Sequence, residues 1–362
     1  MRALHVSLFC TLTVACADSG SSETADGSTG DSATGSNGSS STRGPEPTSG
    51  STSGNDSGST TSSETTDADS SSGNDSTGKG AGSGLELLVC NFTADSVSRF
   101  DLDDGAHLGD LGPAKELDGA LGIAVGPDGA LYVASEESNM VLRFDGSSGA
   151  LLDRFIWDDP DTPEDETGGL QGPAAVLFGP DDNLYISSFD SDAILRYGSD
   201  GTFVDVFVPP GTGGLDGPDA GMVFGPDGDL FVPGYYSNTI ARFDGATGDY
   251  EGDFTSSDEL SRPRTLVFQG EHLYVANEGS GAVLRFDADN GEFVDVFVGA
   301  GELGSPAGMV FDPAGVLHVV SVGNNTVLRF GADGTPLDTL VDAAAAGLDA
   351  PTHIVLAPAL GS

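Results

Sequence analysis

The sequence predicts an all-β fold, a six-bladed β-propeller with four antiparallel strands in each blade. Three observations predict this fold. A segment of about 43 to 53 residues recurs along the chain after residue 84. Each copy contains four short apolar runs separated by Gly, Pro, Asp and Asn, the residues that favour turns. The two ends of the repeating region each lack the strands that the other end supplies.

The complete copies share one order of elements. An apolar run ends in a turn such as GPDG at 126–129, and a second run such as LYVA at 131–134 follows. A polar loop then leads to a third run of the VLRF type, and a Gly-containing turn leads to a fourth. The five complete copies span residues 123–156, 175–208, 221–255, 265–298 and 308–341.

The ends of the repeating region complete a sixth blade. Residues 352–358, THIVLAP, supply only a first strand. Residues 86–101 align without gaps to residues 130–145, and residues 106–111 supply a fourth strand. One C-terminal and three N-terminal strands therefore close the ring, which removes two exposed sheet edges.

The quoted motifs resemble those of a known group of propellers. GPDGALYVASEESNMVLRFDGSSG at 126–149 resembles an NHL-type repeat, with its turn, its LYVA strand, Asn139 and its Phe-Asp-Gly exit. The chain is similar, over about residues 85–358, to six-bladed propellers of the NHL, gluconolactonase-like and streptogramin-lyase-like superfamily. That superfamily contains lactonases, lyases, adhesive proteins and scaffolds, so the resemblance implies a fold and no single activity.

The N-terminal region predicts export. Arg2 and the apolar stretch to Ala15 form an export signal over residues 1–17. LTVAC at 12–16 resembles a bacterial lipobox, so Cys16 is the candidate for lipid attachment, while ACA at 15–17 is the alternative, an ordinary cleavage site. Residues 18–84 contain no Val, Leu, Ile, Phe, Tyr or Trp, which predicts a disordered linker before a propeller over residues 85–362.

The net charge of the chain limits the classes of partner that it can bind. With 57 Asp and Glu against 13 Lys and Arg, the formal charge is −44, which excludes nucleic acid and anionic membrane surfaces. No apolar run is long enough to span a membrane, so membrane contact is expected only through a lipid on the N-terminus. We expect a monomer, in the outer membrane or at the cell surface if lipidated and otherwise secreted or periplasmic.

One arginine recurs in every blade and predicts a structural role. It stands on the third strand before an aromatic residue, and strand alternation places the two side chains on opposite faces. We expect its stem to cover apolar surface and its guanidinium to meet carbonyls or aspartates of the turns. The alternative is a cationic ring that binds an anion. The six residues are Arg99, Arg143, Arg196, Arg242, Arg285 and Arg329.

Residues that break the repeat mark a candidate ligand-binding face. In a propeller, the loops between second and third strands share one face with the linkers between blades. Exposed aromatic, acidic and amide groups there suit a saccharide or a protein partner, while the alternative is that they plug the channel mouth. The candidates are Trp157, Phe189, Asp190, Tyr235, Tyr236, Arg262, Arg264 and His353.

Catalytic and metal-binding chemistry is less well supported. The resemblance implies that lactonases of the superfamily hold a divalent cation in the channel with a carboxylate and amides. Asn91 and Asn277 are the positions nearest that pattern and remain the candidates for calcium or another divalent cation. His353 and Glu278 are the candidates for a general base and its partner. No nucleophile elbow, phosphate loop or dinucleotide fingerprint is present in the sequence.

These observations lead to one expectation and two alternatives. We expect an exported, lipid-anchored propeller that binds a small molecule, a saccharide or a protein, and the sequence favours this binding role over catalysis without deciding between them. The first alternative is a metal-dependent lactonase or lyase with a cation in the channel. The second is a purely structural surface protein.

Overall fold

A computed structural model describes residues 82–113, 115–161, 164–343 and 347–360. The expected export signal, Cys16 and the expected linker up to residue 81 lie outside the described residues. Within the described part of the chain, no helix is long and apolar enough to cross a membrane.

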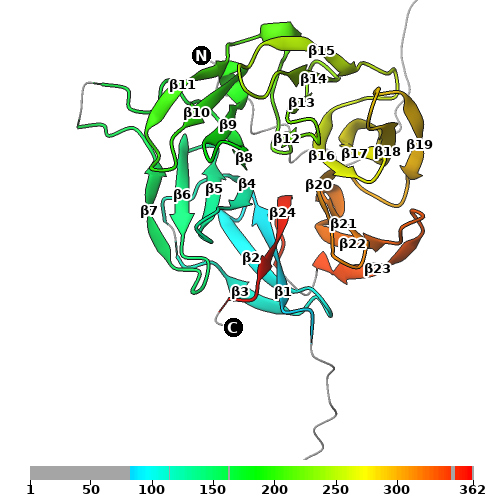
Figure 1. The fold of residues 1–362 in the computed structure, drawn as a ribbon. Coiled ribbons are helices and arrows are strands. Elements are labelled where there is room, and N and C mark those ends of the chain that lie inside the picture. The colour runs from blue at the N-terminus through cyan, green and yellow to red at the C-terminus, as the bar shows by residue number, and fades with distance from the viewer. Residues whose placement is uncertain (1–81, 114, 162–163, 344–346, 361–362) are drawn as a thin grey trace, which may run out of the picture. The chain divides into compact units, whose positions relative to one another are not determined.

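The described residues form six four-stranded antiparallel sheets arranged in a ring, as the sequence predicts (Figure 1). Short runs of alternating apolar residues make the strands, and the glycine, proline and aspartate turns separate them. The strands of the first three blades are β4 (Ala120–Val125), β5 (Leu131–Ser135), β6 (Met140–Phe144), β7 (Leu151–Ile156), β8 (Pro173–Phe178), β9 (Leu184–Ser188), β10 (Ala193–Tyr197), β11 (Phe203–Val208), β12 (Val223–Phe224), β13 (Leu230–Gly234), β14 (Thr239–Phe243) and β15 (Tyr250–Thr255).

The remaining blades follow the same plan, and short 3₁₀ turns interrupt four loops of the described chain. These elements are β16 (Pro263–Gln269), β17 (His272–Asn277), β18 (Ala282–Asp287), β19 (Phe293–Val298), β20 (Pro306–Phe311), β21 (Leu317–Ser321), β22 (Thr326–Phe330), β23 (Pro336–Val341), β24 (Pro351–Pro358), β1 (Leu85–Asn91), β2 (Ser96–Asp101), β3 (His107–Asp110), η2 (Phe189–Ser191), η3 (Thr212–Gly214), η4 (Glu278–Ser280) and η5 (Val322–Asn324).

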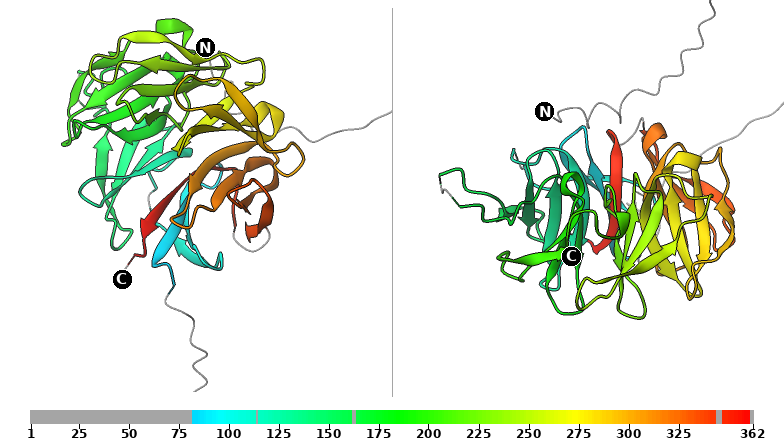
Figure 2. Two further views of the ribbon diagram at one scale, coloured as in Figure 1. Left: turned by 45° about the vertical axis from the view of Figure 1, so that its right-hand side comes forward. Right: turned by 90° about the horizontal axis from the view of Figure 1, so that it is seen from above.

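The sixth blade is composite, which confirms the predicted ring closure. Its strand order is β24–β1–β2–β3, so the last strand of the chain pairs with the first. The pairing is antiparallel and places Leu85 opposite Pro358 and Val89 opposite Ile354. Figure 2 shows the two strands lying side by side in both further views.

Aromatic triads pack the interfaces between consecutive blades. Tyr132 of β5 meets Phe155 of β7 at 4.8 Å and Phe178 of β8 at 5.0 Å between ring centroids, both edge to face. Edge-to-face contacts are favourable beyond the burial of area alone. Three further interfaces repeat the triad, centred on Tyr185, Phe231 and Tyr274. The core therefore lies between blades and repeats around the ring.

The repeated arginines lie in these interfaces. Arg143 forms a two-pronged ion pair with Asp153, at 3.2 and 2.5 Å, and stacks 4.9 Å above the centroid of the Phe155 ring. Most partners stand on strands, not in the turns as expected, because the outer strand places a carboxylate beside the guanidinium. The partners, in order of the six arginines, are Glu86, Asp153, Asp205, Asp229, Asp295 and Asp338.

An amide or carboxylate latch joins five of the blades to the next linker. The latch residue lies in the loop between the second and third strands of a blade and has a positive φ. Its side-chain oxygen accepts a hydrogen bond from a backbone N–H of the linker that leads to the innermost strand of the next blade. Asn and Asp tolerate this left-handed conformation better than most residues. The pairs are Asp95 with Gly119, Asn139 with Gly172, Asp192 with Gly217, Asn238 with Arg262, and Asn325 with Ala350.

Candidate functional site

A ring of six side chains follows the second strands at the face formed by the linkers. Because strand two of every blade ends there, the next residue projects toward the channel mouth. Phe92 and Phe189 pack there against the first residues of the innermost strands, including Leu121 and Ala174. The six positions hold Phe92, Glu136, Phe189, Tyr235, Glu278 and Val322. The two glutamates thus stand on opposite sides of the ring, with aromatic or apolar residues between them.

A buried ion network surrounds Glu278 at the channel mouth. Arg264 of β16 is 3% exposed and donates from Nε to Asp219 at 2.9 Å and from Nη1 to Glu278 at 3.3 Å. The hydroxyl of Tyr235 donates to the other oxygen of Glu278 at 2.9 Å. Burial works to lower the pKa of Arg264, but Asp219 and Glu278 raise it overall, so the guanidinium stays charged.

An aromatic wall stands beside this network. We use that name for Phe189, Tyr235 and Tyr236. The two tyrosine rings meet edge to face at 5.0 Å, and Phe189 lies 5.7 Å from Tyr236. Tyr235 is 5% exposed and Tyr236 is 40% exposed, so the wall has a fixed base and an accessible tip. Burial raises the pKa of the Tyr235 hydroxyl, which remains a donor at neutral pH.

Arg262 flanks the wall in a strained backbone conformation. Its guanidinium carbon lies 5.6 Å from the centroid of the Tyr235 ring, and Nη1 lies 3.5 Å from Glu278. Its φ is +52°, in the left-handed region that glycine adopts at least cost. Glycine occupies the equivalent linker position in three blades, as Gly119, Gly172 and Gly217, and Ser305 and Ala350 hold it with positive φ in the other two. A long charged side chain stands at this position only in Arg262 among the six blades described, which is a pointer to function.

Glu136 is a site residue that sequence reasoning missed. Glu136 follows the second strand of its blade, as Glu278 follows the second strand of another blade, so an alignment of the repeats could have revealed it. Burial, followed by the carboxylates of Asp219 and Asp190, raises its pKa to about 8. Among the described residues no neighbour donates a hydrogen bond to its carboxylate, and the residue is partly exposed. Its neutral and charged forms therefore coexist near pH 8.

Asp219 was missed as well. It directly follows Pro218, which bridges Gly234 at the place where prolines begin other innermost strands, and it is 2% exposed. Its own carboxylate accepts a hydrogen bond from the next backbone N–H, that of Ala220, at 2.6 Å. The residue after this proline is Ala174 or Ala307 in other blades, so the aspartate was a visible departure from the repeat, and Arg264 is its ion-pair partner.

His353 lies deeper in the channel than the mouth residues. His353 is the third residue of β24, whereas Arg264 is the second residue of the equivalent strand β16, so His353 stands one residue further from the mouth. It is partly exposed. Its Nδ1 is buried and has no hydrogen-bond partner among the described residues. Burial lowers the pKa of His353 to about 4, so the imidazole is neutral at physiological pH.

The structure does not bring all predicted face residues together. Trp157 follows β7, the outermost strand of its blade, and its ring lies under Arg154, 5.0 Å from the guanidinium carbon. Asp190 is exposed next to Phe189, and its field reaches Glu136 and Tyr236. The mouth therefore gathers the predicted residues other than Trp157, which follows an outer strand, and His353, which lies deeper in the channel.

Asn91 and Asn277 hold linkers in place. The Asn277 oxygen accepts the backbone N–H of Ser261 at 2.7 Å, and its amide donates to the carbonyl of Glu259 at 2.9 Å. Serines make the same linker contacts at the equivalent position of three blades, as Ser135, Ser188 and Ser321 do. Both side chains are fully buried and both amide oxygens accept a linker N–H, so the structure gives each of them a role in holding its linker.

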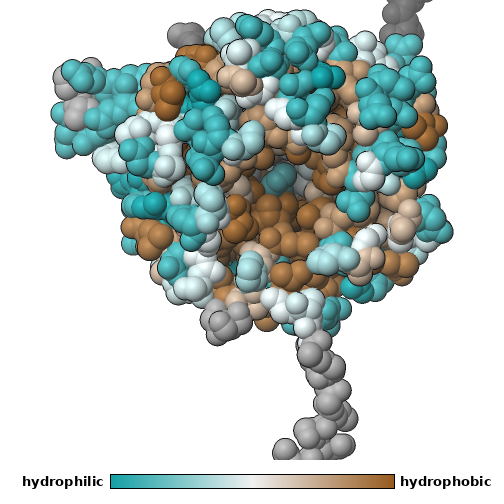
Figure 3. All heavy atoms as spheres, viewed as in Figure 1, coloured by the Kyte–Doolittle hydropathy of each residue, from teal (hydrophilic) through white to brown (hydrophobic). Residues whose placement is uncertain are grey.

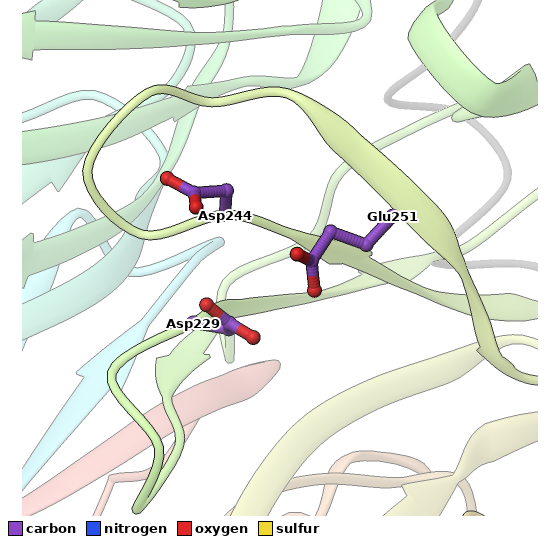
Figure 4. Close-up of side chains that lie close together, drawn as sticks. All are labelled: Asp229, Asp244 and Glu251. Atoms are coloured by element: carbon purple, nitrogen blue, oxygen red, sulfur yellow. The ribbon is translucent and has the colours of Figure 1, made fainter.

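One group of carboxylates lies on the outer part of the third blade. Figure 4 shows Asp229, Asp244 and Glu251 pointing toward one another. Arg242 lies among them, with Nη2 2.5 Å from Asp229 and Nε 3.0 Å from Glu251. Asp244 also caps its own turn through the N–H groups of Ala246 and Thr247. The ion pair and the turn account for this cluster.

Comparisons with known proteins agree on the fold. The sequence matches no protein-family model and no curated protein. The propeller of a nidogen/laminin complex matches with 16% identity, covering 75% of this chain and 98% of that one, at a TM-score of 0.61. A protein of unknown function from Bacteroides caccae matches with 13% identity, covering 76% and 99%, at a TM-score of 0.56.

A lyase is also similar in structure. Catalytically inactive virginiamycin B lyase from Staphylococcus aureus, solved with quinupristin, matches with 16% identity, covering 70% of this chain and 88% of that one, at a TM-score of 0.51. Identities this low establish a shared fold and leave activity to be argued from the site. The chain is a six-bladed β-propeller, and streptogramin B lyase-like propellers are among the structures that share its fold.

Proposed function

We propose that the propeller is a protein-binding module whose partner docks on the channel-mouth face, against the aromatic wall and Arg262. The observation that carries the proposal is the strained, exposed Arg262 beside the exposed tip of Tyr236, above a buried ion network. Tyrosine and arginine are enriched among residues that dominate binding energy at protein interfaces. Nidogen, a structural neighbour, is named in complex with laminin.

The wall is rigid before any partner binds. A Cβ at Gly217 would lie 2.9 Å from Tyr236 and 3.1 Å from Phe189, so the chain passes close beneath both rings. Tyr235 is fixed from below by its hydrogen bond to Glu278. A preorganised surface loses little conformational entropy on binding, which favours affinity.

The acidic surroundings set the charge of the partner. The carboxylates of Asp190 and Asp216 lie near Tyr236, and the whole chain has a formal charge of −44. Such a field accelerates the approach of positively charged proteins and slows that of acidic ones. We therefore propose a basic partner, anchored at short range by Tyr236 and Arg262.

The test uses a random peptide library displayed on phage, selected on the wild-type protein. Enriched peptides should carry an excess of Lys and Arg and should lose at least tenfold in affinity for Tyr236→Ala. Tyr250→Ala is the matched control, because Tyr250 is 38% exposed on outer strand β15. Arg262→Gly should weaken binding while leaving the melting temperature unchanged or higher, because glycine relieves the positive φ.

Two results would reject this proposal. One is the absence of enriched peptides, and the other is enriched peptides that bind both tyrosine variants equally. A glycan array that responds to the protein and depends on Tyr236 would assign the face to saccharides instead.

A second candidate is acid–base catalysis at the same mouth, favoured by the pKa of about 8 at Glu136. A carboxylate that titrates near neutral pH is suited to accept a proton from a bound substrate. Turnover of a lactone or a streptogramin by the wild type, lost in Glu136→Gln without loss of stability, would favour this candidate over the binding module.

Export and a lipid on Cys16 complete the proposal and rest on the sequence alone. In a bacterial host, labelled palmitate should enter the full chain and not Cys16→Ser. Equal labelling of the two would reject the lipid.

A further inference from the structure

The ring has a second concave feature, on the face opposite the mouth. Figure 3 shows a hollow at the centre of the ring that is lined largely by hydrophobic residues. The innermost strands end toward this side, as the course of β24 shows (Figure 2). Five of these strands carry a partly exposed aliphatic side chain near this end: Leu177, Val223, Val267, Val310 and Val355. We call this feature the apolar funnel.

The funnel narrows toward the mouth because the innermost strands touch there. A Cβ at Gly308 of β20 would lie 2.7 Å from the Cα of His353. The hydroxyl of Thr352 donates toward the carbonyls of Ala120 and Leu121 in β4, at 3.1 and 3.0 Å. The N–H of Leu266 donates to the carbonyl of Gly221 at 3.1 Å. Cross-blade bonds thus hold the strands together at one end, and the strands diverge toward the other.

The neutral imidazole of His353 lies at this narrow level. It precedes Val355 by two residues on β24, so both side chains project to the same side of the strand. The wide part of the funnel is therefore aliphatic, and the partly exposed imidazole of His353 stands near its closed end, at the level of the buried Thr265. A largely apolar pocket with one or two polar groups is the usual form of a small-molecule site.

The rim of the funnel carries only negative charge. The turns between first and second strands stand closest to the opening, and their charged residues are Asp or Glu throughout: Asp128, Asp181, Asp182, Asp227, Glu271 and Asp312. The nearest cations, Arg196 and Arg242, pair with Asp205 and Asp229 and also reach two rim carboxylates, those of Asp181 at 4.0 Å and Asp227 at 2.9 Å, so the excess of negative charge rests on Asp128, Asp182 and Glu271. The rim therefore favours a positive group directly above an apolar cavity.

We propose that the apolar funnel is a binding site for small amphipathic cations, with an aliphatic group in the cavity and an ammonium group at the acidic rim. This site is separate from the mouth and does not depend on the protein-binding function proposed above. The aliphatic group gains by leaving water, and the cation gains from several carboxylates at once.

The experiment measures calorimetric binding of alkyltrimethylammonium ions to the full chain, below their micelle-forming concentrations. The octyl compound should bind about fourfold more tightly for each methylene it has beyond the hexyl compound. Octanol should bind more weakly, and octyl sulfate should not bind measurably. Raising the salt concentration should lower the affinity for the ammonium ion several-fold and leave the affinity for octanol unchanged.

Val310→Lys is the test variant, since it places a cation inside the funnel, and affinity for the octyl ammonium should fall at least tenfold. Val294→Lys on β19 is the matched control, because Val294 is 43% exposed on an outer strand. The double variant Asp182→Asn with Glu271→Gln removes two rim charges from exposed turn residues. This double variant should lower the affinity for the octyl ammonium ion and leave the affinity for octanol unchanged. It tests the proposal even if Val310→Lys does not fold.

Three results would overturn the proposal. The first is no binding by any ammonium ion, and the second is equal loss of affinity in the Val310 and Val294 variants, which would indicate nonspecific surface binding. The third is binding of octyl sulfate as tight as that of the ammonium, which would contradict the role of the rim.

Discussion

At the scale of the residue, Glu136 should make stability depend on pH. Its pKa rises from 4.5 to about 8 on folding, so the folded protein binds this proton more tightly than the unfolded chain does. The stabilisation is fully present below pH 4.5 and is lost as the pH rises toward 8. Glu136→Gln should thus be more stable than the wild type at pH 8, by roughly 2 kcal/mol after allowance for solvent screening.

Urea unfolding at pH 5 and pH 8 measures this difference. Glu302→Gln, a change at an exposed glutamate, serves as the control and should leave the pH dependence of the wild type intact. If Glu136→Gln follows the wild-type pH dependence, the carboxyl group ionises in the mouth without cost and the raised pKa is wrong.

The site residues differ in how far the sequence could reveal them. Tyr235, Tyr236 and Arg264 departed visibly from the repeat, and the structure gathers them at the mouth. Glu136 escaped notice because its position was compared with the strand pattern and not with Glu278 of another blade. Trp157 drew attention as a unique residue, yet it lies at the outer rim. That a residue type occurs once in the chain does not say where the residue lies, whereas its place in the repeat does.

At the scale of the element, the linkers are held by side chains at the ends of the second strands. Asn277→Ala would leave the N–H of Ser261 and the carbonyl of Glu259 without their buried partner. We expect a loss of about 1–3 kcal/mol in the free energy of unfolding. Asn277→Ser should retain part of it, because serine makes this contact in other blades. Thermal and urea unfolding measure both variants.

Asn290→Ala, in an exposed turn, is the control for this change and should cost much less. The same measurements test the metal prediction. If calcium raises the melting temperature of the wild type and not that of Asn277→Ala, the amide binds a cation and the linker role described here is incomplete.

The strands were more predictable than the loops that join them. Strand order and blade number follow from apolar runs and turn residues, because both are local properties repeated six times in the described chain. The channel mouth depends on which linkers meet across the ring, and that is a property of the closed fold. The pairing of Arg264 with Asp219, 45 positions apart in sequence, had no local signal.

At the scale of the whole molecule, the ring depends on its composite blade. A chain that ends at Asp349 lacks β24, so β1 loses its partner and β4 loses the hydroxyl of Thr352. Because every blade contacts two others, we expect this chain to lose its cooperative thermal transition. Circular dichroism and one-dimensional proton NMR measure the outcome.

A chain that ends at Ala359 keeps β24 and is the control for the truncation. Adding a synthetic peptide of residues 350–362 to the truncated chain should restore the transition by supplying the missing strand in trans. A truncated chain that melts like the wild type without the peptide would show that an open ring is stable.

The composite blade also determines how the domain responds to mechanical load. Leu85 and Pro358 stand opposite each other at the same end of the β1–β24 pair. Tension applied between these two residues would act across the backbone hydrogen bonds and break them one after another, as a zipper opens. Strands pulled along their length in shear must break many bonds at once. The ring is thus closed firmly against thermal opening and weakly against a pull on its own two ends.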